Sequence, residues 1–362
     1  MNLNPLVSVI VPAHEGGTRL ARCLAALRAS HYSSFEIIVA DDASTVRSVE
    51  ECCREVGGVH VVRLAMRSGP AAARNAAARV ARGEILLFID SDVEVRPDTL
   101  SRVATVFAER PDIAALFGSY DDSPSEQNFL SQYKNLYHHF VHQRGRREAE
   151  TFWAGCGAVR RAAFERVGGF DEARYREPSI EDIELGYRLR RSGCAILLDR
   201  QVQVKHLKRW SLSSLLRADI ARRALPWSWL ILERRGMVND LNLRASERLC
   251  AVLVGFSVLS LLLSPFRPAL LVVAVALLFG VAVISRELYA FFLQRRGVLF
   301  ALAAFPLQAL YYFYSGATFT LCWCAHKLGM RRFATEGEKC EVAAGESIAP
   351  RQNFYEQKEG QG

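Results

Sequence analysis

The sequence lacks the marks of several common protein classes. Its nine cysteines include no C-x-x-C pair, and Cys322 and Cys324, two residues apart in an apolar stretch, are poorly spaced for zinc. The start, MNLNPLVSVIVPAH, has no basic residue before its short apolar run, so it does not resemble a secretory signal peptide. No segment resembles a module that reads RNA or DNA. These absences favour a reduced protein that faces the cytosol and does not bind nucleic acid.

Charge is scarce along one part of the chain. The formal net charge is +8, which is modest for 362 residues. From residue 249 to 325 the sequence is dominated by Leu, Val, Ala and Phe, and charged residues occur only in short islands. Up to about residue 243, short apolar runs alternate with charged and Gly- or Pro-containing stretches, as in a soluble domain. Basic clusters beside apolar spans hold membrane ends at an anionic cytoplasmic surface, so the pattern favours a membrane partner.

Three apolar stretches are candidates for membrane helices, which need about 20 residues each. Residues 249–263 and 269–284 are joined by a tight SPFRP turn, and together 249–284 predict a helical hairpin. Basic residues flank both ends of this hairpin, so the positive-inside rule predicts a multi-pass protein of the cell membrane whose N-terminal domain faces the cytoplasm. Residues 298–325 either cross the membrane or are re-entrant or interfacial, since crossing would leave the basic HKLGMRR outside. A buried hairpin in a soluble protein stays open as an alternative.

The chain therefore divides into four predicted segments. Residues 1–210 form an α/β domain, and 211–246 form a juxtamembrane segment that contains the amphipathic ADIARRALPWSWLILERRG and could lie on the bilayer surface. Residues 247–326 contain the membrane helices. The polar residues 327–362 are expected to be a disordered tail.

The first segment alternates strand and helix patterns. The strands are predicted at LVSVIVPA, FEIIVADDAS, VHVVRLA and EILLFIDSD, and the helices at RLARCLAALRAS, residues 48–56 and GPAAARNAAARVA. Continuous apolar strands separated by helices indicate a mostly parallel, Rossmann-like sheet with helices on both faces. Ligands of such sheets bind at the carboxyl ends of the strands.

Three of the predicted strands end in groups that suit a nucleotide or a metal. These groups are Pro12 and Ala13, then Asp41 and Asp42, then Asp90 and Asp92. A carboxylate pair at i and i+2, fixed by a buried strand, can share Mg²⁺ or Mn²⁺, which also binds substrate phosphates. An isolated D-x-D is more often a solvated turn, but the second acid pair at the same sheet edge favours a binding site.

A further acid pair, Glu181 and Asp182, begins the stretch EDIELGYRLRRSG, whose apolar spacing predicts a helix. Ser179 is the expected N-cap, with Asp182 three positions after it. A purely structural role is available to both acids, because carboxylates in the first turn interact favourably with the helix dipole.

In combination, these motifs resemble family 2 glycosyltransferases of the GT-A fold over about residues 6–210. The resemblance rests on VSVIVPAHEG, EIIVADDAST, GPAAARNAAARVARGEILLFIDSD, FWAGCGAVRRAAFERVGGFDE and EDIELGYRLRRSG, which occur in the family's order. The chain departs from the family at His14-Glu15, where Tyr-Asn is common, and at Ala43-Ser44, where the family has Gly-Ser. Neither departure removes an acid, so they bear on donor preference more than on fold.

The resemblance implies a role for each acid and for several neighbours. The nucleotide of a UDP- or GDP-sugar would contact Asp42 or Asp41, the backbone near Pro12 and Ala13, and Arg74, although a surface-helix role for Arg74 is equally plausible. Asp92 would ligate Mg²⁺ or Mn²⁺, Asp90 would contact the sugar or a metal-bound water, and His206 would complete the metal or diphosphate site. Asp182, beside Glu181, would be the general base that activates the acceptor hydroxyl in an inverting displacement.

The stretch VKHLKRW contains Lys205, Lys208, Arg209 and Trp210. It resembles the Q-x-x-R-W element of processive family members but lacks the Gln. We expect Arg209 and Trp210 to hold the diphosphate or the acceptor, or else to belong to a basic juxtamembrane patch.

The resulting hypothesis is a membrane-anchored inverting glycosyltransferase that acts on a lipid-linked acceptor or another cell-envelope glycan. A polyprenyl-phosphate sugar synthase is the nearest alternative, but its anionic acceptor needs no base. A nucleotidyltransferase would need a basic, Gly-rich loop, of which EGGTR at 15–19 is a feeble version. A non-catalytic membrane scaffold would be expected to have lost some of these acids.

Overall fold

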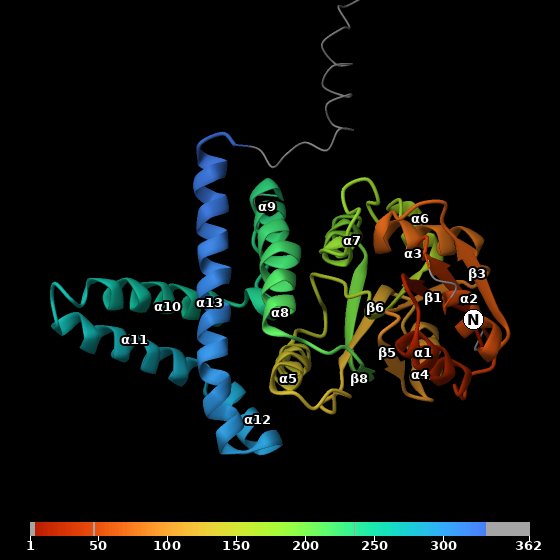
Figure 1. Cartoon of the computed structure of the whole chain (residues 1–362). Coiled ribbons are helices and arrows are strands. Elements are labelled where there is room, and N and C mark those ends of the chain that lie inside the picture. The colour runs from red at the N-terminus through yellow and green to blue at the C-terminus, as the bar shows by residue number, and fades with distance from the viewer. Residues whose placement is uncertain (1–3, 46–47, 235, 331–362) are drawn as a thin grey trace, which may run out of the picture.

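The structure, a computed structural model, describes residues 4–45, 48–234 and 236–330. An α/β unit is followed by long helices that lie along one side of it and project away from it (Figure 1). Most of the tail predicted at 327–362 lies outside the described residues.

A sheet of eight strands forms the centre of the α/β unit. The strands are β1 Val7–Ala13, β2 Phe35–Asp41, β3 Val59–Arg63, β4 Ile85–Ile89, β5 Val93–Val95, β6 Ile113–Tyr120, β7 Cys156–Arg160 and β8 Ala195–His206. Their order in the sheet is β3-β2-β1-β4-β7-β6-β8-β5. The first four strands pair in parallel, as predicted, and β6 pairs in parallel with β8. The pairs β4–β7, β6–β7 and β5–β8 are antiparallel, so the sheet is mixed.

Helices cover both faces of this sheet. They are α1 Thr18–Arg28, α2 Ser48–Val56, α3 Gly69–Val80, α4 Thr99–Glu109, α5 Phe129–Arg144, α6 Arg161–Arg166 and α7 Glu181–Arg191. In Figure 1, α3 and α6 lie above the strands, and α1 and α4 lie below them. The predicted α/β class, with helices on both faces, is confirmed.

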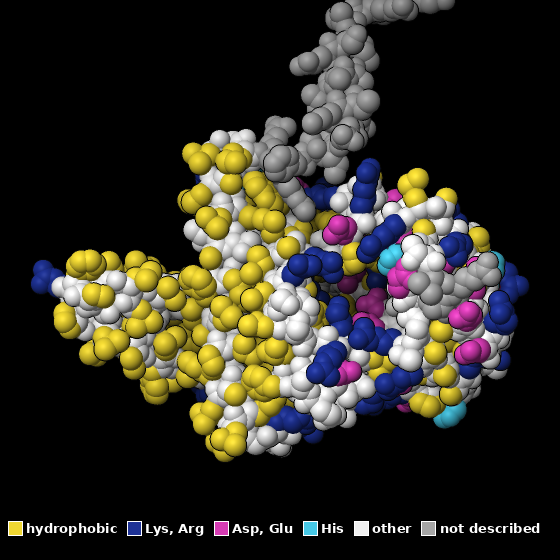
Figure 2. Space-filling model, in the orientation of Figure 1, with side chains coloured by type: hydrophobic (Ala, Val, Ile, Leu, Met, Phe, Trp, Pro, Cys, Tyr) yellow, Lys and Arg dark blue, Asp and Glu magenta, His cyan; other side chains and the backbone are white. Residues whose placement is uncertain are grey.

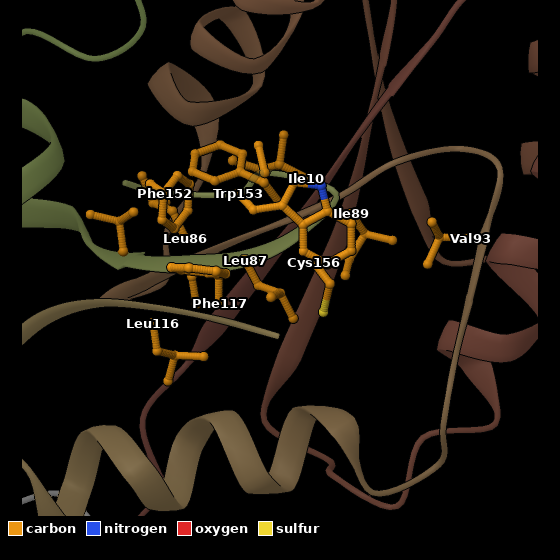
Figure 3. Close-up of a cluster of buried hydrophobic side chains, with 14 of the residues drawn as sticks. Ile10, Leu86, Leu87, Ile89, Val93, Leu116, Phe117, Phe152, Trp153 and Cys156 are labelled. Atoms are coloured by element: carbon orange, nitrogen blue, oxygen red, sulfur yellow. The ribbon is translucent and has the colours of Figure 1, made fainter. Parts of the chain in front are cut away.

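The core fixes the strand that carries the first acid pair. Every residue of β4 is buried, as its unbroken apolar run predicts. Leu86, Leu87 and Ile89 of β4 lie among side chains from neighbouring strands and loops, including Ile10, Phe117 and Trp153 (Figure 3). Because Asp90 follows β4 directly, this packing sets the position of the acid pair.

A helical connection follows the sheet. It consists of α8 Leu212–Asp219, a π-helical turn η1 Ile220–Ala224, α9 Leu225–Arg234 and a short 3₁₀ turn η2 Leu241–Leu243. A π-turn is uncommon and is often found at a functional site. The sequence predicted an amphipathic helix here but gave no sign of the π-turn.

Four helices form the apolar region. They are α10 Ala245–Leu263, α11 Ala269–Ile284, α12 Arg286–Arg296 and α13 Val298–Lys327. Helices α10 and α11, which the sequence analysis predicted as a hairpin, lie side by side and project from the molecule (Figure 1). By length and composition α10 and α13 could each cross a membrane, and α11 with α12, bent by 68°, could make a third span. Figure 2 shows hydrophobic side chains over both the hairpin and α13.

Helix α13 runs across the direction of the hairpin and lies against the α/β side of the molecule (Figure 1). Two hydroxyl–acceptor bonds join it to that side: Tyr133 Oη donates to Gln308 Oε1 at 2.7 Å, and Tyr314 Oη donates to Asp219 Oδ2 at 2.7 Å. Leu299 and Leu321 are 80% and 70% exposed. The helix therefore has one face bonded to protein and another that leaves apolar side chains bare.

Gly69, the first residue of α3, lies between the end of β2 and the loop that precedes α7. Its φ is +88°, and a Cβ there would lie 2.3 Å from the carbonyl oxygen of Arg176. Its N–H donates to Asp42 Oδ2 at 2.9 Å. Only glycine fits both the left-handed backbone and the close approach to the loop that precedes α7.

Gly69→Ala should therefore destabilise the α/β unit more than the matched variant Gly193→Ala. Gly193 also has a positive φ, +79°, but a Cβ there meets nothing within 4 Å. We expect Gly193→Ala to cost about 1–2 kcal/mol for the backbone conformation alone, and Gly69→Ala to add a clash of about 1–3 kcal/mol. Thermal unfolding of the purified chain measures both, at roughly 2–4 °C per kcal/mol. Equal melting temperatures for the two variants would contradict the close approach.

Candidate functional site

Arg74 joins the two acid pairs that the sequence placed far apart. Its Nη2 donates to Asp90 Oδ1 at 2.7 Å, and its Nη1 donates to Glu181 Oε1 at 2.9 Å. The side chain is buried on α3, and the two neighbouring carboxylates favour its charged form, which raises its pKa although burial opposes this. The surface-helix alternative for Arg74 is wrong. Asp90 and Glu181 are 91 positions apart in sequence but share one guanidinium.

The D-x-D pair lies at the edge of the sheet, with Asp92 beside His206. Val93 at the start of β5 pairs with His206 at the end of β8, and this register brings His206 Nε2 to 3.8 Å from Asp92 Oδ2. Burial raises the pKa of Asp90 despite Arg74. Burial alone would also raise the pKa of Asp92, but the neighbouring His206 imidazole and nearby cations outweigh burial, and the pKa of Asp92 is lowered.

Asp182 is oriented by the backbone. Its Oδ2 accepts from Ala154 N at 3.1 Å and its Oδ1 from its neighbour Ile183 N at 2.8 Å. Burial, reinforced by the charge of Glu181, raises the pKa of Asp182 to about 6. A buried carboxylate with a pKa close to neutrality is suited to accept a proton.

The predicted N-cap of this helix is wrong. Helix α7 begins at Glu181, and its cap residue is Ile180, which provides no side-chain bond. Ser179 instead donates its hydroxyl to the carbonyl of Arg222 in η1 at 3.1 Å, and its N–H donates to Glu181 Oε2 at 2.9 Å. The tertiary bond to η1 thus replaces the local cap.

The acids after β2 lie at the N-terminus of α3. Both carboxylate oxygens of Asp42 accept backbone N–H groups, from Ser68 at 2.6 Å and Gly69 at 2.9 Å. Asp41 is buried, and its Oδ1 accepts from Ser44. Pro12 and Ala13 end β1 beside them, since Ala13 pairs with Asp41 in the sheet. The predicted donor-side residues are therefore together, although Asp41 and Asp42 are partly engaged by the loops they support.

The basic stretch after β8 points in two directions. Arg209 is mostly exposed and lies 3.5 Å from Glu126, whereas the ammonium of Lys208 lies over the ring of Trp210. Burial lowers the pKa of Lys208, and the charges of Asp92 and Asp90 oppose that shift. Lys208 is therefore the cation of this stretch that lies near the metal-site acids, and Trp210 is anchored in the protein through Ser131 and Asn128. The sequence analysis favoured Arg209 over Lys208, because the path of the chain after β8 cannot be inferred from the sequence.

An aromatic cluster that the sequence did not reveal lies beside Asp92. Tyr120 stacks on His206 with ring centroids 4.1 Å apart, and it also contacts His138 and Trp153. Burial lowers the pKa of His138 well below its usual value and that of His142 to about 4, so both rings are neutral at pH 7. The HHFVH stretch thus forms part of an uncharged wall. The only signal in the sequence was its i, i+4 histidine spacing.

A large cavity of about 850 Å³ begins at Asp182 and extends to the apolar helices. At one end its lining includes Asp182, His138 and Trp153, and at the other it includes side chains of α10 and α13. Arg223 of η1 also lines it, a residue that the sequence analysis did not single out. Asp42, Asp90 and Asp92 do not line this cavity, so it reaches Asp182 but not the D-x-D pair. Figure 2 shows a hollow in the surface where acidic and basic side chains gather.

The donors near Asp92 fit a hard divalent cation. Asp92 supplies a carboxylate without a hydrogen bond from Arg74, and His206 supplies an imidazole nitrogen next to it. Among the residues that the structure describes, no group of three or more acids, histidines or cysteines forms a complete metal cage. Mg²⁺ typically takes one or two protein carboxylates and leaves its other positions to substrate phosphates and water, so the pair suffices. Asp90 is less available, because one of its oxygens is bonded to Arg74.

Part of the chain is similar in sequence to known glycosyltransferases. Residues 8–168 match the family model described as glycosyl transferase family 2. Validoxylamine A glucosyltransferase of Streptomyces hygroscopicus subsp. jinggangensis is 29% identical over 234 residues, which cover 54% of this chain and 54% of that protein. Glycosyltransferase GlyG of Streptococcus pneumoniae is 29% identical over 130 residues, which cover 35% of this chain and 43% of that protein. The chain thus spans about half the length, or less, of these curated relatives.

A solved structure shows the same fold. The mannosyltransferase PcManGT from Pyrobaculum calidifontis, in complex with GDP-Man and Mn²⁺, matches with a TM-score of 0.55 at 19% identity, over 88% of this chain and 87% of that one. The α/β unit described here, with its two acid pairs joined through Arg74, has the GT-A fold, and residues 8–168 of it match the model of glycosyl transferase family 2.

Proposed function

We propose that this protein transfers a sugar from a nucleoside-diphosphate sugar to an acceptor hydroxyl at a membrane, with inversion at the anomeric carbon. One observation carries the proposal: Arg74 donates to Asp90 and to Glu181, so the D-x-D pair and the Glu-Asp pair belong to one site. A leaving-group side and an acceptor side are thereby held a fixed distance apart by a buried guanidinium.

The donor would bind on the D-x-D side. Asp42, Pro12 and Ala13 would line the nucleotide pocket at the carboxyl ends of β1 and β2. Asp92 and His206 would hold Mg²⁺ or Mn²⁺, with Asp90 at the sugar, and Lys208 would add positive charge for the diphosphate. When bound, the cation would stabilise the negative charge of the departing diphosphate. PcManGT, which binds GDP-Man and Mn²⁺, supports a UDP- or GDP-sugar with such a metal.

The acceptor would bind on the Asp182 side. The Asp182 carboxylate, fixed by Ala154 N and Ile183 N, would accept the proton of the attacking hydroxyl. Glu181 stays engaged by Arg74 and Ser179 N, so we assign it to positioning the start of α7. Attack from this side, opposite the diphosphate, inverts the anomeric configuration in a single displacement.

Membrane attachment would come from the α10–α11 hairpin. Its helices, with 19 and 16 residues, are about 28 and 24 Å long at 1.5 Å per residue, close to a hydrocarbon core of about 30 Å. Because α13 runs across the direction of the hairpin, the hairpin and α13 cannot both lie parallel to the membrane normal. Helix α13 has one face bonded to protein and another with exposed apolar side chains, which suits a position along the membrane surface. Arg244, Arg248 and Arg286 at the base of the hairpin favour a cytoplasmic catalytic unit.

The alternatives explain less. A polyprenyl-phosphate sugar synthase uses an anionic acceptor that has no proton to lose, so Asp182 would have no role as a base. A nucleotidyltransferase or a non-catalytic scaffold gives no reason for a base and a D-x-D pair joined through one arginine.

Asp182→Asn should nearly abolish transfer. The amide cannot accept the acceptor proton, so we expect the rate to fall by about 10²–10⁴-fold, with donor affinity unchanged. Release of nucleoside diphosphate, with UDP- and GDP-sugars and a membrane lipid extract as acceptor, measures the rate, and calorimetry measures donor affinity. The exposed Glu165→Gln is the control. A parallel loss of donor affinity would contradict the role of Asp182 as base.

The pH dependence of the rate should report the same carboxylate. Burial raises the pKa of Asp182 to about 6, so the base is ionised above pH 6 and is progressively protonated below it. At saturating donor and metal we expect a plateau above neutrality and a fall of roughly tenfold per pH unit well below the pKa. A rate that stays constant from pH 8 to pH 5 would exclude Asp182 as the base.

Asp92→Asn should weaken metal binding. Mn²⁺ binding to the purified protein with UDP or GDP, followed by electron paramagnetic resonance, should become at least about tenfold weaker, since even the loss of an outer-shell partner costs that much. Asp112→Asn, a surface variant on the loop before β6, should bind Mn²⁺ like the unaltered chain. Unchanged Mn²⁺ affinity in Asp92→Asn would place the cation elsewhere.

A further inference from the structure

The cavity beyond Asp182 is larger than the activation of one hydroxyl requires. Its lining comes from two different environments. Near Asp182 it is made by the α/β unit, and farther on it is made by helices of membrane-spanning length. The far part is lined by apolar or small residues, among them Val252, Gly255, Phe256 and Leu259 on α10 and Phe313 and Gly316 on α13. An occupant of the whole cavity must therefore have a polar end and a long apolar end.

The helix surfaces around the far end are bare. Leu262 on α10 and Leu321 on α13 are mostly exposed, as expected for side chains that meet hydrocarbon. From Glu247 to Leu259 the lining follows α10 for about 18 Å, which exceeds half of a hydrocarbon core of about 30 Å. The far end of the cavity thus runs alongside apolar surface over a length that a hydrocarbon chain can fill.

Besides Asp182, the charged side chains that line the cavity are Lys134, Asp219, Arg223, Glu247 and Arg248. Glu247, at the start of α10, accepts from the hydroxyls of Tyr137 and Tyr312. Lys134 is bound by Asp219, with nitrogen–oxygen distances of 2.5 and 2.7 Å, so its charge is balanced. Arg223 lines the cavity, is exposed, and forms no ion pair with any residue the structure describes. Arg248, at the start of α10, donates to the sulfur of Met237 and has no ion pair with an acid in the described part of the chain. Arg223 is close enough to Asp182 for their charges to interact, so it is the cation nearer the proposed base.

The π-turn explains why Arg223 faces the cavity. The carbonyl of Arg222 accepts from Ser179, two residues before the Glu-Asp pair, while α13 contacts the other side of η1. Asp219, which precedes η1, is held by Lys134 of α5 and Tyr314 of α13. The turn is thereby fixed between the loop that carries Asp182 and the apolar helices, and it aims a cation at the boundary between them.

We propose that this cavity binds a phosphate-bearing membrane lipid as the acceptor: the hydrocarbon chain lies between α10 and α13, the phosphate pairs with Arg223, and the hydroxyl-bearing end reaches Asp182. This assignment rests on the proposed function, the transfer of a sugar to a hydroxyl, and adds to it the chemical class of the acceptor. A soluble glycan would leave the apolar part of the cavity in contact with water, and a neutral lipid would leave Arg223 without a partner.

Photolabelling of the full chain tests the proposal. The protein is placed in phosphatidylcholine nanodiscs with hexadecyl phosphate that carries a diazirine near the end of its chain, or with hexadecanol that carries the same group. After illumination, labelled peptides are mapped by mass spectrometry. We expect the phosphate probe to label segments 247–259 and 311–321, and the alcohol to label them at least about tenfold less, since a charged hydrogen bond is worth that much or more.

Two variants and a matched control sharpen the test. Arg223→Gln should reduce labelling by hexadecyl phosphate about tenfold and leave labelling by hexadecanol unchanged. Gly255→Trp, which fills open space in the cavity, should reduce labelling by both probes. Leu262→Trp places the same side chain on the same helix outside the cavity and should change neither.

Three results would overturn the proposal. The first is equal labelling by the two probes with no effect of Arg223→Gln. The second is labelling of α11 as strong as that of α10 and α13, which would indicate general contact with lipid. The third is displacement of the probe by an equal concentration of inorganic phosphate, which would indicate a site for free phosphate.

The failure of the proposed function would look different. Labelling requires neither a nucleotide nor a charged Asp182, so it can succeed even if Asp182→Asn retains transfer, and that result would contradict only the role of the base. Conversely, transfer to a water-soluble acceptor that stays intact in Gly255→Trp, without cavity labelling, would overturn the lipid and leave the transferase.

Discussion

The buried guanidinium of Arg74 is the interaction on which the rest of the site depends. Asp90, Asp92, Glu181 and Asp182 bring four carboxylates into one region, and burial and neighbouring carboxylates raise the pKa of Asp90 and of Asp182. Arg74, only 5% exposed, donates to one member of each pair. Removal of one partner from a buried ion pair typically costs about 3–5 kcal/mol, because the other charge is left uncompensated. Arg74 is thus a direct side-chain link between the two pairs.

The same helix connects this guanidinium to the nucleotide side. Asp42 accepts the N–H groups of Ser68 and Gly69 at the start of α3, and Arg74 lies on that helix. Helix α3 therefore links the end of β2, the end of β4 and the start of α7 through side chains that are already bonded. Such groups need little rearrangement when a substrate binds, which is the condition for stabilising developing charge efficiently.

The local parts of this structure could be predicted from the sequence, and the non-local parts could not. Strands β1 to β4, helices α1 to α3 and the hairpin follow from apolar patterns within a few residues. Strand β5 has three residues, and its pairing with β8 joins positions more than 100 residues apart, so no local pattern indicates it. The Ser179 cap was wrong because a tertiary bond to η1 competed with it.

The candidate site shows the same division. The sequence identified the acids, but Lys208, Tyr120 and Arg223 depend on a turn, a stack and a π-turn that have no signature in composition. The direction of α13 was open for a similar reason. Its apolar content suits a span, yet its Gln308 accepts from Tyr133 of α5 and its Tyr314 donates to Asp219 of α8. The roles of individual residues stay predictions.

The cavity between α10 and α13 has a consequence for how the two substrates would meet. The concentration that matters for a nucleotide sugar is its amount per volume of water. For a molecule that enters between exposed apolar helices, it is the amount per area of bilayer. The lipid would then reach the site by diffusion in the plane of the membrane, and the nucleotide sugar by diffusion through the solution. Dilution with inert lipid would slow the reaction even when the total amount of every reactant in the tube stays constant.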